Sequence, residues 1–201
     1  GVAPKAQWIG CVNLDRNLAN PALYLDCMQF MLAPFPQGGD PLFDGDPTKA
    51  AHVMNNSWGC PSIEGCDPNA LLYAANNLRD AGIFVVVSTG NDGPSCETVE
   101  SPLSLYDSVF SVGAIDQFGD MADFSSRGPV TADGSGRNKP DIVAPGVDIL
   151  SSLPENTYGS NSGTSMAGPH MVGVVALIWS AQPDLIGDID ATEQLIIDTA
   201  R

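Results

Sequence analysis

Ser165 stands where a loop of small residues gives way to a long apolar run, in the stretch SGTSMAGPH. Its neighbours Gly163, Ala167 and Gly168 are small enough to let another backbone come close. Backbone N–H groups in the first turn of a helix have no partners within the helix and lie at the positive end of its dipole. A serine there could attack a carbonyl carbon while its own N–H binds the resulting oxyanion. The alternative is that Ser165 only caps the helix.

Asn91 follows the apolar run VVVST, which predicts a buried strand. Open α/β sheets build their sites at the carboxyl ends of such strands. The side-chain amide of Asn91 could therefore donate to the same oxyanion as the N–H of Ser165, so that the two residues form an oxyanion hole. The alternative is a turn residue, because Asn-Asp-Gly is typical of turns.

The elements that must position these residues alternate along the chain. Apolar runs and helical periodicity predict strands at AQWIGCV (6–12), AHVMNNS (51–57), IFVVVST (83–89), VFSVGAI (109–115) and DIVAPG (141–146), and helices at PALYLDCMQFML (21–32), NALLYAANNLRDAG (69–82), SMAGPHMVGVVALIWSA (165–181) and ATEQLIIDTA (191–200). The helix after Ser165 is apolar nearly all round, so we expect it to be buried. Pro169 is expected in its first turn, where a missing N–H costs least. Alternating strands and helices predict one α/β domain over residues 1–201, with a mostly parallel sheet between two helical layers.

Several motifs resemble those of the subtilisin-like serine proteases, the subtilases. GTSMAGPH is similar to the family's catalytic-serine motif, STGNDGP to its oxyanion-asparagine motif and HVMNNSWG to its substrate-binding strand. FSSRGP and KPDIVAPGVDILSSLP resemble the approach to the serine, and GVAPKA resembles the segment after the family's histidine helix. The resemblance implies that Ser165 is the nucleophile and Asn91 the oxyanion donor. It also implies two walls of a substrate pocket, formed by Ser57, Trp58 and Gly59 and by Ser88, Thr89 and Gly90.

The chain departs from the family in its catalytic base. Subtilases order their triad as aspartate, histidine, serine, and no HGTH-like stretch occurs here. The only histidines, His52 and His170, match no family position, and His170 is rotated off the helix face of Ser165. We therefore expect the isolated chain to be inactive, with its base in a missing N-terminal segment of the same protease. A non-enzymatic binding or structural module on the same scaffold is the alternative.

The same resemblance implies a gap in the sheet. In the family, the strand that ends in the catalytic aspartate lies between the strands that AQWIGCV and AHVMNNS resemble. Without that strand both neighbours keep unpaired backbone groups, and the fold is a subtilisin-like sheet truncated at its N-terminus.

Composition and charge limit the partners. The chain has 201 residues, 43% of them hydrophobic, with a net charge of −16. A strongly acidic surface repels phosphate backbones and anionic lipid, so nucleic acid and membrane surfaces are not expected as partners. The partners that the resemblance implies are polypeptide substrates.

The chain has five cysteines. Buried free thiols are one interpretation, and a secreted protein with one or two disulfides is the other and the one we favour. A disulfide is expected among Cys60, Cys66 and Cys96, involving Cys60, which follows the substrate strand of the family.

Two further expectations concern loops. The carboxylates of Asp40, Asp44 and Asp46 lie in one turn-rich segment, and oxygen ligands suit the calcium that subtilases often bind. A solvated acidic loop is the favoured interpretation, so no cofactor or metal residue is assigned. The family resemblance also predicts a cis peptide bond at Ser101–Pro102.

Overall fold

The computed structural model describes residues 1–14 and 18–201. Four α-helices and six β-strands follow one another in the order α1 (Pro21–Leu32), β1 (Val53–Asn56), α2 (Leu72–Asp80), β2 (Phe84–Ser88), β3 (Phe110–Ile115), β4 (Ile142–Pro145), β5 (Ile149–Leu153), β6 (Thr157–Asn161), α3 (Thr164–Ala181) and α4 (Ile189–Thr199). Short 3-10 helices occupy Pro47–Lys49, Ser62–Glu64, Pro154–Asn156 and Pro183–Leu185. The four predicted helices and four of the five predicted strands are confirmed.

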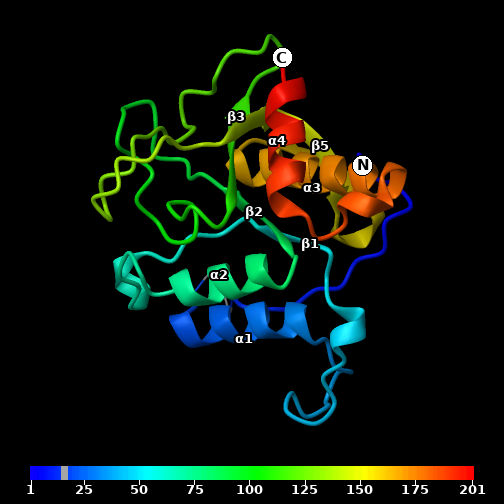
Figure 1. Ribbon diagram of the computed structural model, residues 1–201. Coiled ribbons are helices and arrows are strands. Elements are labelled where there is room, and N and C mark those ends of the chain that lie inside the picture. Colours follow the sequence, from blue (N-terminus) through cyan, green and yellow to red (C-terminus); the bar gives the residue numbers. More distant parts are fainter. Residues whose placement is uncertain (15–17) are drawn as a thin grey trace.

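The central sheet has four parallel strands in the order β1-β2-β3-β4. All five residues of β2 are buried, which explains its continuous apolar sequence. α1 and α2 cover one face of the sheet, and α3 and α4 cover the other (Figure 1). The predicted α/β architecture with helices on both faces is therefore confirmed.

Local sequence signals explain where the helices begin and end. Asn20 caps α1 by accepting a hydrogen bond from the Leu23 N–H, and Pro21 occupies the first helical position. Gly82 has a φ of +78°, a conformation that glycine adopts without steric cost, and it turns the chain from α2 into β2.

α3 is less completely buried than its sequence predicts. Its buried residues include Ala167, Met171, Val175 and Trp179, which pack in the cluster on that face of the sheet, whereas Leu177 is 48% exposed. The helix lies as a surface layer with one face on the sheet, so its outward apolar residues stay partly accessible.

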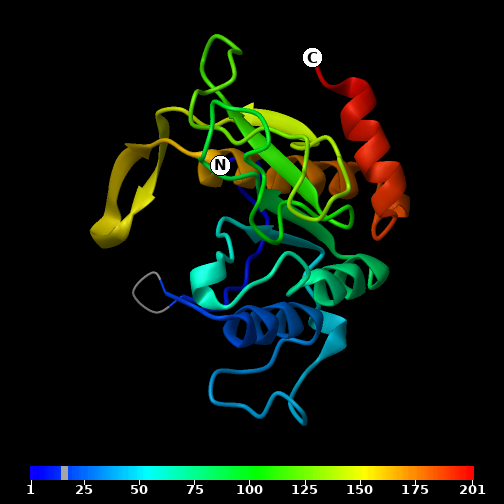
Figure 2. The same cartoon turned by 90° about the vertical axis from the view of Figure 1, so that its left-hand side faces the viewer.

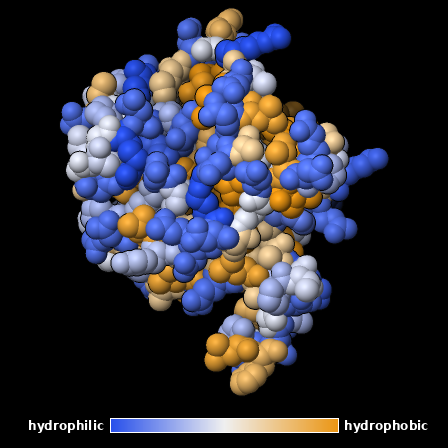
Figure 3. Space-filling view, viewed as in Figure 1, coloured by the Kyte–Doolittle hydropathy of each residue, from blue (hydrophilic) through white to orange (hydrophobic). Residues whose placement is uncertain are grey.

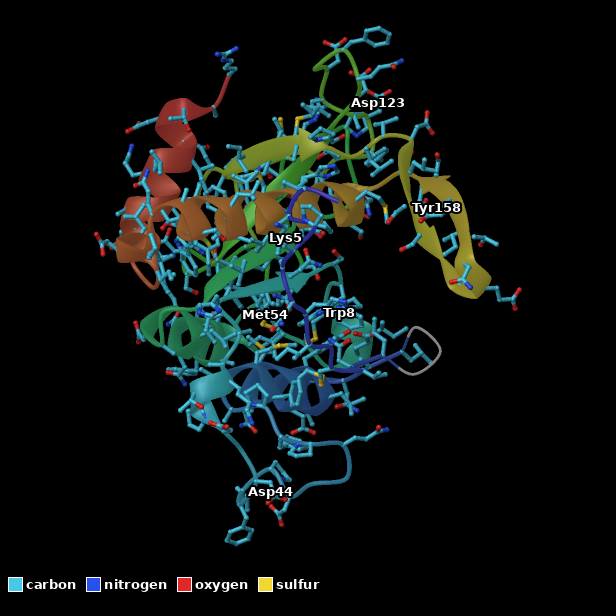
Figure 4. The ribbon with its side chains drawn as sticks, turned by 90° about the vertical axis from the view of Figure 1, so that its right-hand side faces the viewer. Lys5, Trp8, Asp44, Met54, Asp123 and Tyr158 are labelled. Carbon is cyan, nitrogen blue, oxygen red and sulfur yellow. A yellow bond between two sulfur atoms is a disulfide. The ribbon has the colours of Figure 1, made fainter. Side chains whose placement is uncertain are left out.

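The strand predicted at residues 6–12 is wrong. This segment has no regular secondary structure, and Trp8 and Val12 are each 88% exposed. Figure 4 shows the segment carrying Lys5 and Trp8 past α3 and past β1, the strand of Met54. A strand needs a neighbour for its backbone N–H and C=O groups, and in the part of the chain that the structure describes the sheet ends at β1.

The antiparallel hairpin β5–β6 was not predicted. It projects from the body of the molecule (Figure 2). None of its ten strand residues is buried, and Leu150 and Tyr158 are 68% and 74% exposed. Without a buried face, the sequence lacks the alternation that identifies a strand.

Two disulfides close segments near the first helical layer. They join Cys11 to Cys27 and Cys60 to Cys66. The expectation of a bridge that involves Cys60 is confirmed. Cys96 is an exposed free thiol within the described residues.

The cis peptide bond expected at Ser101–Pro102 is wrong. The cis bond of this segment lies one residue later, between Pro102 and Leu103, and the cis X–Pro bonds are Gly93–Pro94, Gly128–Pro129 and Lys139–Pro140. In the described part of the chain, no helix has the length and apolar character needed to cross a bilayer.

Candidate active site

Ser165 is the second residue of α3 and lies at the carboxyl-end edge of the sheet. Its Oγ is 3.5 Å from the carbonyl oxygen of Ser57, which follows β1. In return, the Ser57 hydroxyl donates to the carbonyl oxygen of Ser165 over 3.2 Å. The two contacts join the start of α3 to the end of β1, so the sheet fixes the position of the serine.

The hydrogen bond from the Ser57 hydroxyl to the Ser165 carbonyl oxygen is possible because residue 169 is a proline. In a regular helix the N–H of residue 169 would bond to the carbonyl of residue 165, but proline has no N–H. Pro169 is the sixth residue of α3. The expectation that it lies in the first turn, where a backbone N–H has no partner in the helix, is therefore wrong. Because Pro169 has no N–H, the Ser165 carbonyl oxygen is free to accept the hydrogen bond from the Ser57 hydroxyl.

The side chain of Asn91 is oriented by Thr164. The Asn91 Oδ1 accepts hydrogen bonds from the Thr164 backbone N–H at 2.9 Å and from the Thr164 hydroxyl at 3.1 Å. With its oxygen held in this way, the side chain of Asn91 keeps an amide N–H₂ group that can donate to another oxygen. The sequence reasoning missed Thr164, although it directly precedes Ser165 and a threonine there can bond locally through its hydroxyl.

All residues predicted for the site line one cavity of about 140 Å³. The cavity is lined by Ser57, Trp58, Gly59, Ser88, Thr89, Gly90, Asn91, Ser101, Ser104, Thr164 and Ser165. Three of these, Ser101, Ser104 and Thr164, were not predicted from the sequence. The first two lie in the segment before β3, and no local pattern distinguishes them from ordinary loop serines.

Gly59 and Gly90 let the two walls of the cavity pack closely against the serine side chains beside them. A Cβ added at Gly59 would lie 2.5 Å from the Ser101 Oγ, and one at Gly90 would lie 2.7 Å from the Ser126 Oγ. Gly90 also has a φ of +115°, which other residues rarely adopt. A larger residue at Gly59 would displace the Ser101 hydroxyl, which lines the cavity, and one at Gly90 would displace the Ser126 hydroxyl.

Tyr24 of α1 supports the wall that contains Trp58. The two rings stack with their centroids 3.9 Å apart and their planes at 11°. The fully buried Tyr24 hydroxyl lies 2.7 Å from Glu64 Oε2, to which it donates, and 3.1 Å from the carbonyl oxygen of Gly59. Burial, followed by the hydrogen bond to Glu64, raises the pKa of Tyr24 well above its usual value. The wall therefore rests on a neutral, ordered tyrosine.

Neither histidine belongs to the cavity lining. The Nδ1 of His170 lies 2.9 Å from the carbonyl oxygen of Met166, within its own helix. His52 precedes β1, at the opposite end of that strand from Ser57, and its ring packs edge-on against Trp179. Among the described residues, no side chain is placed to take a proton from Ser165.

The acidic loop between α1 and β1 is held together by hydrogen bonds to its own carboxylates. One oxygen of each carboxylate accepts bonds from the loop itself: Asp40 from the Leu42 N–H, Asp44 from the Asp40 N–H, and Asp46 from Thr48. Within residues 1–14 and 18–201, no three acidic, histidine or cysteine side chains gather as metal ligands would. The hydrogen bonds instead order a projecting loop, which carries Asp44 in Figure 4 and has a hydrophobic tip in Figure 3, formed by Leu42 and Phe43.

A serine at a helix N-terminus and an asparagine whose amide oxygen is held by hydrogen bonds therefore lie together at the carboxyl-end edge of a parallel α/β sheet. Residues 1–201 match the profile of the Subtilase family, and the chain belongs to this family of serine proteases.

Known proteins are similar over different parts of the chain. Bacillopeptidase F of Bacillus subtilis is 38% identical over 207 residues, which cover 100% of this chain and 13% of that protein. Subtilisin DY of Bacillus licheniformis is 42% identical over 135 residues, which cover 66% of this chain and 44% of the relative. The chain therefore spans less than half the length of these curated relatives.

Solved structures are similar in fold. Sphericase superposes with a TM-score of 0.73 at 24% identity, covering 94% of this chain and 58% of that one. The S41 psychrophilic protease gives a TM-score of 0.60 at 28% identity, covering 74% and 48%. The subtilisin-like sheet architecture is thus shared, and the described chain matches about half of each structure.

Proposed function

We propose that this chain carries the nucleophile and the oxyanion hole of a secreted serine endopeptidase. Ser165 Oγ attacks the carbonyl carbon of a scissile peptide bond, and an acyl-enzyme forms as the amine leaves. The Ser165 N–H and the Asn91 side-chain amide donate to the oxygen that becomes negative. The observation that carries the proposal is the pair of bonds from Thr164 that holds the Asn91 amide oxygen.

The same proposal includes the inactivity of the isolated chain. A serine hydroxyl without a general base stays neutral and attacks slowly, and both histidines are engaged elsewhere. The base and its orienting carboxylate are supplied by polypeptide outside these 201 residues. The substrates are polypeptides, whose extended backbone would pair with the Ser57–Gly59 wall.

Fluorophosphonate labelling tests both parts of the proposal. The full-length protein that contains this chain should label at Ser165 and hydrolyse a denatured protein substrate. The isolated chain should do neither. Ser165→Ala should abolish both reactions, whereas Ser180→Ala, at the far end of the same helix, should leave them unchanged. Hydrolysis by the Ser165→Ala variant would refute the nucleophile, and stoichiometric labelling of the isolated chain would refute its inactivity.

Secretion is supported by the two disulfides, since such bonds persist in oxidising compartments. Fractionation of producing cells should place the protein outside the cytoplasm with Cys11–Cys27 and Cys60–Cys66 oxidised. Recovery of these four cysteines as free thiols from freshly alkylated cells would contradict secretion.

A further inference from the structure

The side chain of Asn55 on β1 lies toward α3, on the same face of the strand as that of Ser57. Side chains alternate along a strand, and Val53, two residues before Asn55, packs in the apolar cluster on the α3 side of the sheet. A Cβ added at Gly168 of α3 would lie 3.2 Å from the Asn55 Oδ1. The carboxamide of Asn55 therefore lies against α3, about one helical turn after Ser165.

The amide of Asn55 fixes the direction of the Ser57 hydroxyl. Asn55 Nδ2 donates to Ser57 Oγ over 2.9 Å, and the Ser88 hydroxyl donates to the same oxygen over 3.4 Å. A serine hydroxyl has two acceptor lone pairs and one proton. Because both lone pairs accept hydrogen bonds, the proton of Ser57 is directed to the carbonyl oxygen of Ser165, 3.2 Å away.

The bond from Ser57 ties the nucleophile's own backbone to the sheet. The carbonyl oxygen of Ser165 lacks the donor that a regular helix would supply from residue 169, which is proline. The Ser57 hydroxyl, at the end of β1, supplies a donor in its place. Misplacement of a reacting group by 1 Å can slow a reaction by about 100-fold. An anchor at this carbonyl therefore holds the Oγ and the N–H of Ser165 in their reactive positions.

We propose that Asn55 is a positioning residue for the nucleophile and that it acts through the Ser57 hydroxyl. Asn55 is not one of the described residues that line the cavity. Its replacement should therefore lower the rate at which Ser165 reacts and leave the binding of the substrate side chain unchanged. The inference rests on the proposed function, because it takes Ser165 to be the nucleophile.

The test compares kcat with KM for an internally quenched peptide cleaved by the full-length protein. Complete titration with a fluorophosphonate counts the reactive Ser165, so kcat refers to folded protein only. Asn55→Leu removes the donor while nearly keeping the shape of the side chain. It should lower kcat about fivefold, the effect of one hydrogen bond, with KM within about twofold of wild type. Asn55→Ala removes the same donor and should give the same result, so an effect of the leucine itself would appear as a difference between the two variants.

A double variant tests whether Asn55 acts through Ser57. Ser57→Ala removes the hydroxyl and should lower kcat about tenfold. Adding Asn55→Leu to Ser57→Ala should lower kcat no further, because no hydroxyl is left to orient. Independent structural effects would instead multiply in the double variant. Two controls should keep the wild-type kcat: Asn77→Leu at an exposed position of α2, and Ser180→Ala, whose hydroxyl donates to the Ala176 carbonyl at the far end of α3.

The outcomes separate this inference from the proposed function. A wild-type protein that neither labels at Ser165 nor cleaves the peptide would overturn both. If the wild type reacts and Ser165→Ala does not, the proposed function stands. The inference alone is then overturned by an unchanged kcat in Asn55→Leu, by a change confined to KM, or by multiplied reductions in the double variant. Loss of titratable protein in both Asn55 variants would also overturn it, because Asn55 would then be needed for folding.

Discussion

Tyr24→Phe removes one oxygen atom from a fully buried position and leaves the stack on Trp58 in place. The lost hydroxyl donates to Glu64 over 2.7 Å and lies 3.1 Å from the Gly59 carbonyl oxygen. A hydrogen bond to a charged group contributes about 1.5–3 kcal/mol. Glu64 is only half-buried, and water can partly replace the lost donor. We therefore expect a loss of about 2 kcal/mol in the free energy of unfolding.

Urea denaturation followed by far-UV circular dichroism measures this loss. The midpoint should fall with an unchanged m value, because the same surface is exposed on unfolding. For a domain of this size the melting temperature should fall by about 4–8 °C. Tyr73→Phe is the matched control, since Tyr73 on α2 is 83% exposed, and it should change the free energy of unfolding by less than about 0.5 kcal/mol.

A double-mutant cycle with Glu64→Ala isolates the pair. Tyr24→Phe and Glu64→Ala should couple by about 1–2 kcal/mol, as contacting residues in one network do. A coupling near zero, or a Tyr24→Phe variant as stable as the Tyr73→Phe control, would show that the hydroxyl does not hold the pocket wall.

Other changes give equally specific outcomes. Burial raises the pKa of Tyr106 to about 12; its contribution to stability should be complete below about pH 10 and lost as pH rises toward the folded value, so Tyr106→Phe should show a shallower alkaline decline in melting temperature. Replacing Cys11 and Cys27 by serine opens a loop with a sequence separation of 16 and should cost about 3 kcal/mol in calorimetric stability, whereas wild-type stability in the double variant would contradict the bridge. Gly90→Ala places a methyl group 2.7 Å from the Ser126 Oγ at a φ of +115°, and it should lower the midpoint of urea unfolding by the equivalent of about 1–3 kcal/mol.

The sequence predicts the buried elements of the fold and the helix ends that have a local signal. β2 and β3 are apolar because they are buried on both faces, and the cap at Asn20 and the turn at Gly82 have local causes. The error at residues 6–12 arose because a short apolar run predicts a strand without testing whether a neighbouring strand exists. The hairpin β5–β6 was missed for the opposite reason: it pairs with itself outside the core and needs no apolar face.

The candidate site divides in the same way. Ser165 and Asn91 were found because each carries a local motif, and the family resemblance gave the residues of both walls. Ser101, Ser104 and Tyr24 reach the site only through the tertiary fold, and no local pattern in their own segments indicates it. The effect of Pro169 could not be predicted either, because the sequence does not show which group donates to the Ser165 carbonyl oxygen that proline leaves without a helical partner.

Arg79 connects the two helical layers that the sheet keeps apart. Its guanidinium group on α2 bonds to Glu193 at 2.7 and 2.9 Å and to Asp190 at 2.5 Å, both on α4. Opening of either helix therefore breaks contacts of the other, although the two helices pack in separate apolar clusters. Local unfolding normally proceeds through units that open independently. These ion pairs tie α2 to α4, so a change that releases α4 also removes contacts from α2, the helix that packs beside α1 behind one wall of the cavity.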